Sequence, residues 1–221
     1  MIKPATFTTA LPIASIRELE RRGLELGLPL MQRAGSAAAQ FLNDHIPNNA
    51  HVLVLVGPGN NGGDALVTAL TLKRLGHRLT VVMPQASPNA PSDAKQALMQ
   101  WLVAGGQVLQ HLPASKPDAI VDGLFGIGLS RSLESPWSEV IKTINSWQVP
   151  TLALDIPSGL QADSGQRSDE VVQATWTLSF IAPSLATVSE HGSPFCGECF
   201  VEDLDLDLNP AAMDQTQQSP P

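Results

Sequence analysis

The chain has 221 residues, enough for one large α/β domain with a substantial core. Its 21 Asp and Glu outnumber 13 Lys and Arg, which gives a net charge of −8 and leaves no basic run to bind nucleic acid. No stretch approaches the roughly 20 apolar residues that span a bilayer, and the N-terminus lacks the pattern of a signal peptide. We therefore expect a cytoplasmic protein that binds neither nucleic acid nor a membrane. Residues 1–206 are expected to form one domain, followed by a flexible tail, 207–221, rich in Gln, Pro and Asp.

Two helices are predicted before the first strand. The first, residues 15–27, starts with the capping-box spacing of Ser15 and Glu18. Its candidate inward stripe consists of three apolar residues, Ile16, Leu19 and Leu24. The second helix spans residues 29–42, because proline suits a first helical turn and small and apolar side chains follow along one face.

The sequence VLVLVGPGNNGGD, residues 52–64, is the most informative part of the chain. Its apolar start predicts a buried strand, a glycine-rich loop follows over residues 57–64, and helical spacing runs from Ala65 to Leu75. Glycines permit unusual backbone angles and the close approach of a ligand, and a helix N-terminus favours an anion such as phosphate. The loop satisfies G-x-G-x-x-G, which alone is weak evidence for nucleotide binding. A tight turn capped by Asn and Asp side chains is the alternative interpretation.

The rest of the chain alternates predicted strands with helices. Strands are expected at residues 79–83, 107–109, 118–122, 151–155, 175–181 and 200–204. Helices are expected at residues 92–104 and 136–147. Such alternation predicts an α/β fold with a mostly parallel sheet covered on both faces, which binds ligands outside the carboxyl ends of its strands.

Three polar loops follow predicted strand ends and are therefore expected to converge in that crevice. They supply the side-chain oxygens of Asn61, Asp122 and Ser158, which suit a ribose hydroxyl or a hard cation. Asp155 ends its strand in the same way. The alternative for each aspartate is that it caps a turn. The agreement among three loops is more specific than any one of them.

Cys196 and Cys199 form a C-x-x-C pair, which can serve redox chemistry or half of a zinc site. The chain has two cysteines, so a four-cysteine site is excluded, and His191 is the histidine nearest in sequence. Because the pair precedes a predicted strand rather than opening a helix, coincidence is the preferred interpretation.

Three motifs, GPGNNGGDALVTA, VDGLFGIGLSR and LDIPSGLQADSG, occur in an order and spacing that resemble the NAD(P)H-hydrate epimerase family, the YjeF N-terminal domain. The segment LMQRAGSAAA resembles the early helix of that family, and FCGE with the following apolar strand resembles its last strand, so the likeness covers residues 13–207. The resemblance implies a Rossmann-like three-layer α/β/α sandwich, usually a homodimer. It also implies an isomerase of metabolite repair, which interconverts the R and S forms of hydrated NADH and NADPH (NADHX and NADPHX) at C6 of the nicotinamide ring. The S-specific dehydratase that acts next, with ATP or ADP, is expected to be a separate protein, because this chain is too short to contain it.

The resemblance further implies a bound potassium ion, K+, with side-chain ligands at Asn61, Asp122 and Ser158. The substrate contacts that it implies are Asn60, Asn61, Gly62, Gly63, Asp64, Gly126, Ile127, Gly128, Leu129, Ser130, Arg131 and Asp155. Asp155 is the candidate acid–base group, because a carboxyl near C6 can protonate the leaving hydroxyl and then accept a proton from incoming water. Such help is worth roughly 10²–10⁴-fold in rate. Burial at a strand end supplies the raised pKa that an acid needs.

The sequence departs from the family at several positions. Ala65 stands where members usually have glycine, and Gln32 stands where they have glutamate. Many members carry a lysine near the position of Ser184, whereas no lysine follows Phe180 in this chain, so Arg131 is the candidate replacement cation. The missing lysine favours an alternative function, a non-catalytic nucleotide-binding or dimerisation module like that of an RNA-decapping scaffold protein. The four retained strand-end residues favour an enzyme.

Overall fold

The computed structural model describes residues 2–5 and 8–206 and contains a seven-stranded sheet with the order β1-β7-β6-β5-β4-β2-β3. The strands are β1 (Lys3–Pro4), β2 (His51–Val56), β3 (Arg78–Val82), β4 (Ala119–Gly123), β5 (Thr151–Leu154), β6 (Trp176–Phe180) and β7 (Glu198–Glu202). β1 pairs antiparallel with β7, whereas the other neighbouring strands run parallel. The predicted mostly parallel sheet is therefore confirmed.

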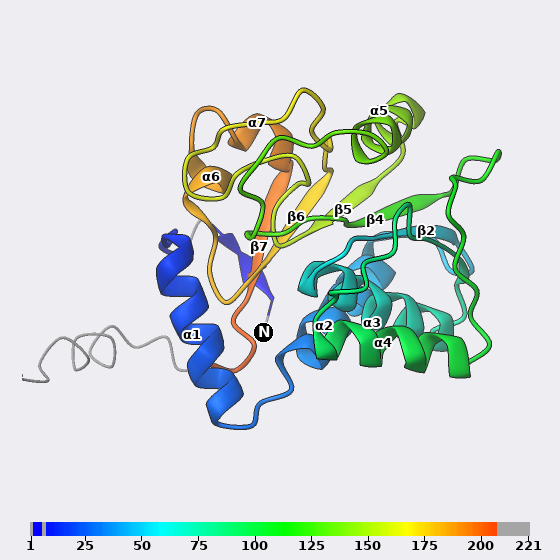
Figure 1. Cartoon of the computed structure of the whole chain (residues 1–221), viewed down its shortest axis with the longest axis horizontal. Helices are drawn as coiled ribbons and strands as arrows, with labels where there is room; N and C mark the ends of the chain where they lie inside the picture. Colours follow the sequence, from blue (N-terminus) through cyan, green and yellow to red (C-terminus); the bar gives the residue numbers. More distant parts are fainter. Residues whose placement is uncertain (1, 6–7, 207–221) are drawn as a thin grey trace, which may run out of the picture.

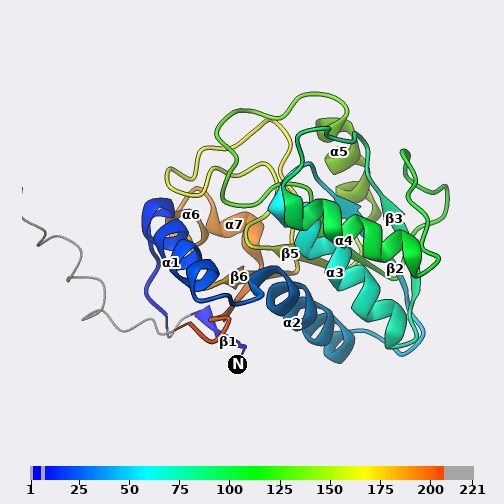
Figure 2. The same ribbon diagram turned by 60° about the horizontal axis from the view of Figure 1, so that its bottom comes forward.

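Helices cover both faces of this sheet. They are α1 (Ile13–Glu25), α2 (Leu30–His45), α3 (Asn60–Arg74), α4 (Ser92–Val103), α5 (Trp137–Trp147), α6 (Leu185–Val188) and α7 (Ser193–Cys196). Figure 1 shows α2, α3 and α4 on one side of the sheet and α5, α6 and α7 on the other. Figure 2 shows the same division, with α1 at the end of the molecule farthest from β3. The three-layer α/β/α sandwich is confirmed.

Alternation along β2 builds the two sides of the core. Leu53 and Leu55 pack with Ile141 and Ile144 of α5 on one face. Val54 faces the other way and packs with the buried sides of α2 and α3. Because every residue from the second to the last in β2 is buried, this strand reads as a continuous apolar run in the sequence.

The sheet order places a crevice next to β2. This strand pairs with β3 on one side and with β4 on the other, so the chain leaves it in one direction and later returns across it. The connections that follow β2 and β4 diverge at this point. Ligands bind open α/β sheets outside the carboxyl ends of the strands at such a switch in strand order.

The start of α3 corrects the predicted glycine loop. The helix begins at Asn60 rather than at Ala65, so residues 60–64 of the predicted loop belong to the helix. Neither Gly62 nor Gly63 has a positive φ. Both are needed for close packing, because a Cβ at Gly62 would lie 2.1 Å from the carbonyl oxygen of Gly57. A Cβ at Gly63 would lie 2.4 Å from Met31 Cε. The role predicted for these glycines in unusual backbone angles is therefore wrong.

The start of α1 also differs from the prediction. The helix begins at Ile13 after Pro12, and no side chain caps it, so the capping box predicted at Ser15 is wrong. Glu18 instead forms ion pairs along the helix, with Arg22 Nε at 2.8 Å among them. A Pro residue before the first turn already sets a backbone angle compatible with the helix start.

The buried face of α1 contains one unexpected residue. Ile16 and Leu19 are buried as predicted, whereas Leu24 is 55% exposed. Gly23 lies on the buried face in its place, where a Cβ would lie 3.1 Å from a methyl carbon of Leu30. A glycine at this position lets α1 and the start of α2 pack closely.

Most other predicted boundaries agree with the structure to within three residues. The predicted strand 107–109 is reduced to one bridge between Leu109 and Val82, and β1, α6 and α7 had no sequence prediction. Cys196 ends α7 and Cys199 lies in β7. The tail predicted at 207–221 lies outside the described residues.

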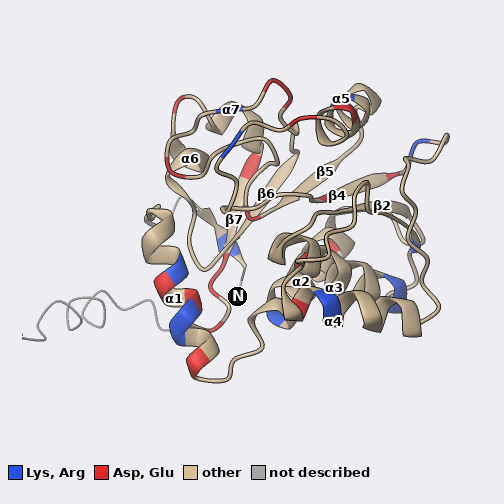
Figure 3. Cartoon of the chain, in the orientation of Figure 1, with Lys and Arg blue, Asp and Glu red and all other residues tan. Residues whose placement is uncertain are grey.

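The described charges are distributed over many elements. Figure 3 shows Lys and Arg scattered over separate elements, with basic and acidic positions interleaved along α1. Within residues 2–5 and 8–206, no helix combines the length and the apolar character that crossing a membrane requires.

Candidate active site

A cavity of about 270 Å³ lies outside the carboxyl ends of β2, β4 and β5. Its walls are the first turn of α3, the loop after β4, the end of β5 and one side of α1. Eight of the residues predicted from the sequence line it: Asn60, Asn61, Asp64, Gly126, Ile127, Gly128, Leu129 and Asp155. The fold therefore gathers residues that are far apart in the chain, as the three polar loops predicted.

The remaining predicted contact residues lie elsewhere. Gly62 and Gly63 pack inside the protein against the β2–α3 turn and Met31. Arg131 lines a larger neighbouring cavity, and Ser130 lines neither of the two cavities. The loop after β4 thus divides its residues between two adjoining spaces.

Asn61 has a buried side chain without a partner. It is 8% exposed, and neither its Oδ1 nor its Nδ2 forms a hydrogen bond with the described residues. Leaving a buried polar group unpaired costs about 1–3 kcal/mol, so such groups are rare in native proteins. Because this amide lines the cavity, a bound ligand or ion is the expected partner.

Asp122 and Ser158 join the ends of two neighbouring strands. Both are fully buried, and the Ser158 hydroxyl donates to Asp122 Oδ1 (2.7 Å) while the Ser158 amide donates to Oδ2 (2.8 Å). The amide of Phe125 donates to Ser158 Oγ at 2.9 Å. Burial raises the pKa of Asp122 to about 6, although the bonds from Ser158 oppose that change. This cluster fixes the loops that carry the cavity walls.

Asp155 is held at the end of β5 in a strained position. Its φ of +70° is unusual for a residue other than glycine, and its Oδ2 accepts a hydrogen bond from the amide of Ile127 at 2.9 Å. A Cβ at Gly126 would lie 2.6 Å from that oxygen, so only glycine leaves room for this contact. Burial raises the pKa of Asp155 to about 6, opposed by hydrogen bonds from the amides of Ile127 and Phe180. Strain of this kind concentrates at functional sites.

Two further carboxyl groups share the cavity with Asp155. Burial raises the pKa of Asp64 well above its usual range, and the charges of Asp155 and Glu20 raise it further. Burial and the charge of Asp155 raise the pKa of Glu20 to about 7, while Arg17 lowers it. Carboxyl groups with such pKa values exchange protons near neutral pH, as acid–base catalysis requires.

The sequence interpretation missed Glu20, Arg17 and Phe180, which also line the cavity. A signal for Glu20 was present, because this partly buried residue lies four residues after Ile16 and three before Gly23, both of which are buried in α1. A carboxylate in an otherwise apolar helical stripe is seldom buried without a role.

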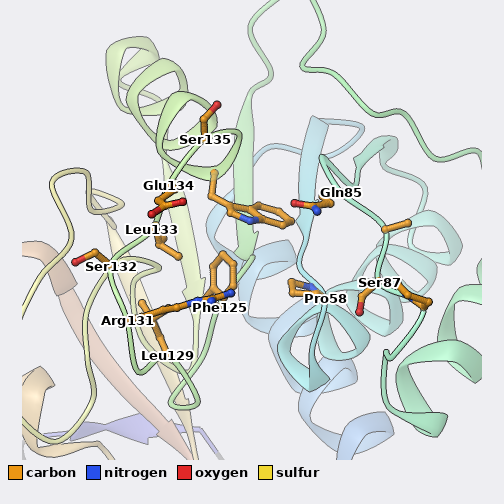
Figure 4. Close-up of a pocket in the computed structure, with 13 residues that line it drawn as sticks. Pro58, Gln85, Ser87, Phe125, Leu129, Arg131, Ser132, Leu133, Glu134 and Ser135 are labelled. Atoms are coloured by element: carbon orange, nitrogen blue, oxygen red, sulfur yellow. The ribbon is translucent and has the colours of Figure 1, made fainter.

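The neighbouring cavity is larger, about 470 Å³, and shares Pro58, Phe125 and Leu129 with the first. Figure 4 shows the Arg131 side chain extending toward Phe125. No hydrogen bond or ion pair joins Arg131 to another described residue. Polar side chains and an aromatic wall complete the cavity, and the ring of Trp137 meets that of Phe125 edge-on at 5.1 Å. Such a mixture suits the base, ribose and phosphate groups of a nucleotide.

The cysteine pair lies apart from this site. Cys196 is buried, Cys199 is partly buried, both are free thiols, and neither lines the two cavities. Among residues 2–5 and 8–206, no three His, Cys, Asp or Glu side chains gather as metal ligands. Ser184, in the segment where the family resemblance implies a lysine, is buried, and its hydroxyl has no partner in the described part of the chain.

Comparison with known families identifies the fold. The model of the YjeF-related protein N-terminus matches residues 27–186, which contain every predicted site residue. The chain belongs to this family. The predicted family resemblance is confirmed.

Individual relatives extend the match over most of the chain. The NAD(P)H-hydrate epimerase of Bordetella pertussis (strain CS) is 48% identical over 198 residues, covering 88% of this chain and 87% of the relative. That of Achromobacter xylosoxidans is 44% identical over 201 residues, covering 90% and 97%. The bifunctional NAD(P)H-hydrate repair enzyme Nnr of Escherichia coli is 36% identical, and the match covers 87% of this chain but 38% of that enzyme. The crystal structure of the yeast protein ynu0 superimposes with a TM-score of 0.73 at 25% identity, covering 83% of this chain and 86% of that one.

Proposed function

We propose that this protein is an NAD(P)H-hydrate epimerase, which interconverts the R and S forms of NADHX and NADPHX at C6 of the nicotinamide ring. The observation that carries the proposal is the position of Asp155, a strained carboxyl with a pKa of about 6 in the cavity at the strand ends. The relatives named NAD(P)H-hydrate epimerase support the same reaction.

The chemistry requires a proton donor and a proton acceptor near C6. The lone pair of the ring nitrogen assists departure of the C6 hydroxyl, which takes a proton from Asp155 and leaves as water. A water molecule then adds to the iminium carbon from the opposite face and loses a proton. Acid–base assistance of this kind is worth roughly 10²–10⁴-fold.

The dinucleotide fits the two adjoining cavities in one direction. The nicotinamide end occupies the smaller cavity, next to Asp155 and Asn61, and the adenosine end extends into the larger cavity. There Arg131, which makes no ion pair with the described residues, contacts a phosphate group. An arginine suits this role because its planar guanidinium binds phosphate through paired hydrogen bonds.

A potassium ion, held by Asn61, Asp122 and Ser158, is part of the proposal. The donor set fits a hard cation, since it offers amide, carboxylate and hydroxyl oxygens, and the Oδ1 of Asn61 is buried without a partner. The carbonyl oxygen of Phe125, 3.1 Å from Ser158 Oγ, is a further candidate ligand. When bound, the ion would order the loops after β4 and β5 and offset phosphate charge.

The proposed function also includes a partner enzyme, an oligomeric state and a cellular location. The product of the epimerase is expected to feed an S-specific dehydratase, and the relatives named bifunctional NAD(P)H-hydrate repair enzymes support coupling to a second repair activity. A homodimer and a cytoplasmic location complete the proposal, on the basis of the family resemblance.

One observation favours a second function, a non-catalytic nucleotide-binding or dimerisation module. Ser184 replaces the lysine that many members carry, and no lysine follows in the sequence. The second function predicts ligand binding without turnover.

A coupled assay separates the two functions. Mixed R and S NADPHX is supplied to an excess of S-specific dehydratase with its nucleotide, and NADPH recovery is followed with and without this protein. The epimerase abolishes the slow phase in which the R form reacts, and Asp155→Asn restores that phase. Persistence of the slow phase at stoichiometric protein, while NADPHX still binds, would establish the binding module instead.

A further inference from the structure

The geometry of the proposed reaction places a demand on the cavity. Departure of the C6 hydroxyl as water from one face of the nicotinamide ring and addition of water to the other require proton transfer on both faces. A side chain fixed on one side of a flat ring cannot reach both positions, because catalytic proton transfer takes place over hydrogen-bond distances of about 2.6–3.2 Å. The cavity must therefore offer a second group that transfers a proton on the other face of the ring.

Glu20 lies on a different wall from Asp155. Asp155 ends β5, whereas Glu20 belongs to α1, and both line the smaller cavity. Two carboxyl groups from two different elements, α1 and the end of β5, can therefore contact one ligand in this cavity. Asn61 lines the same space, and its Nδ2 is buried without a partner in addition to the Oδ1 assigned to potassium, so a ligand that accepts a hydrogen bond is expected between these walls.

The position of Glu20 is fixed by the anchoring of α1. The amide of Ile13 donates to Asp163 Oδ1 at 2.8 Å, and the amide of Leu11 donates to the carbonyl oxygen of Pro183 at 2.8 Å. Ile16 and Leu19 are buried beneath the helix. A helix held at its start and along its face presents the side chain at position 20 to the cavity reproducibly.

Glu20 is also uncommitted, unlike its neighbour on the helix. Glu18 forms ion pairs with Arg21 and Arg22 on the solvent side of α1. Glu20 forms no hydrogen bond or ion pair with the described residues, and Arg17 influences it only through its charge. Its carboxyl group is therefore available to a ligand.

We propose that Glu20 and Asp155 act as a pair of catalytic acid–base groups, one on each face of the bound nicotinamide ring. This inference rests on the proposed epimerase function. The protonated member gives its proton to the C6 hydroxyl, the C–O bond breaks, the nitrogen lone pair forms a C=N bond, and water leaves. A second water adds to C6 from the other face, its oxygen forms the new C–O bond, the C=N electrons return to nitrogen, and the other carboxylate takes the proton. Exchange of a proton with solvent resets the pair.

The electrostatics of the cavity support this assignment. Burial raises the pKa of Asp155 to about 6, and burial together with the charge of Asp155 raises that of Glu20 to about 7. Both charges raise the pKa of Asp64 in the same cavity. Like charges in a buried site favour states in which one carboxyl keeps a proton while another is ionised. One acid and one base at neutral pH is the state that the pair requires.

Oxygen exchange tests the pair directly. Purified R and S NADPHX are incubated separately in H₂¹⁸O with the wild type, Glu20→Gln or Asp155→Asn, and both epimerisation and ¹⁸O incorporation at C6 are measured. Each variant is expected to lose at least about 100-fold in epimerisation. Each still exchanges oxygen with retention in one epimer, because one face keeps its carboxyl, and the two variants retain exchange in opposite epimers.

Controls separate this inference from the function on which it rests. Glu18→Gln changes a carboxyl on the same helix outside the cavity and should behave as the wild type. Melting temperature and the KM for NADPHX report whether Glu20→Gln folds and binds, and Glu20→Asp provides a conservative second variant. Full epimerisation by Glu20→Gln, or exchange in both epimers that depends on Asp155 alone, would overturn the pair while leaving the epimerase intact. Absence of epimerisation and exchange in the wild type would overturn the proposed function itself.

Discussion

Gly126 offers a sharp test of the position of Asp155, because the Asp155 carboxyl occupies space that a side chain at position 126 would need. A Cβ at this position would lie 2.6 Å from Asp155 Oδ2, well inside van der Waals contact. Gly126→Ala therefore forces the carboxyl to move and breaks its hydrogen bond with the amide of Ile127, now 2.9 Å long. A hydrogen bond to a charged group contributes about 1.5–3 kcal/mol, and about 1.4 kcal/mol corresponds to a tenfold change in rate. We expect kcat to fall about 10- to 150-fold.

The same change should alter the pH dependence of the reaction. The Ile127 amide stabilises the ionised form of Asp155 and so lowers its pKa, which means that loss of this bond raises the pKa above about 6. The limb of the kcat/KM profile that Asp155 sets, measured by coupled NADPH recovery, should move to higher pH. Gly128→Ala adds the same methyl group to the same loop without reaching Asp155, since a Cβ there meets nothing closer than Arg17 Nη2 at 3.6 Å, and its KM for NADPHX reports any direct effect on substrate binding. Wild-type kcat in Gly126→Ala, or equal losses in the two variants, would refute this account of how Asp155 is positioned.

Three further predictions address stability, cation binding and substrate recognition. The folded-state pKa of Asp155 is raised from 3.8 to about 6, so this residue favours folding below pH 4 and loses that contribution as pH rises through 6. Asp155→Asn should remove the loss, which makes the variant about 3 kcal/mol more stable than the wild type at pH 8 in urea unfolding. A lower stability than the wild type at that pH would contradict the cost of ionisation. Replacing potassium by tetramethylammonium should lower the melting temperature of the wild type by several degrees but leave Asn61→Ala unchanged; equal sensitivity of the two proteins would argue against Asn61 as a ligand. Arg131→Gln should raise the KM for NADPHX about tenfold with little change in kcat, and an unchanged KM would remove Arg131 from the phosphate site.

Most helices and strands could be predicted from the sequence, because the pattern of apolar residues that marks each of them lies within the element itself. The buried β2 is a continuous apolar run, and the alternation of strands and helices sufficed for a parallel sheet. The strand-end residues Asn61, Asp122, Asp155 and Ser158 followed from the rule that parallel strands direct their carboxyl ends to one edge.

Features that depend on tertiary packing were not predictable in the same way. The start of α3 at Asn60 depends on two close contacts. Gly62 packs against the turn that precedes the helix, and Gly63 packs against Met31, which is far away in the sequence. Leu24 has the spacing of a buried residue, but the packing of α1 against Leu30 leaves it exposed. Hydrophobic period alone does not distinguish such positions.

Departures from the family pattern also required the structure for their interpretation. Ala65 stands where members usually have glycine, and its methyl group is fully buried against Gly123. Gly123 leaves room for this methyl group because it has no side chain: a Cβ at Gly123 would lie 2.4 Å from the Cβ of Ala65. Glu20 belongs to the site because α1 forms one wall of the cavity. The sequence placed that residue on a helix but did not place the helix.

Direct observation of the two epimers tests the central proposal. R and S NADPHX are diastereomers, so chromatography separates them, and each purified form can be followed alone in the presence and absence of this protein. An epimerase accelerates conversion from both sides to the same final ratio, and Asp155→Asn removes the acceleration. Unchanged conversion rates at stoichiometric protein, with NADPHX bound, would contradict the proposal and leave this fold as a nucleotide-binding module.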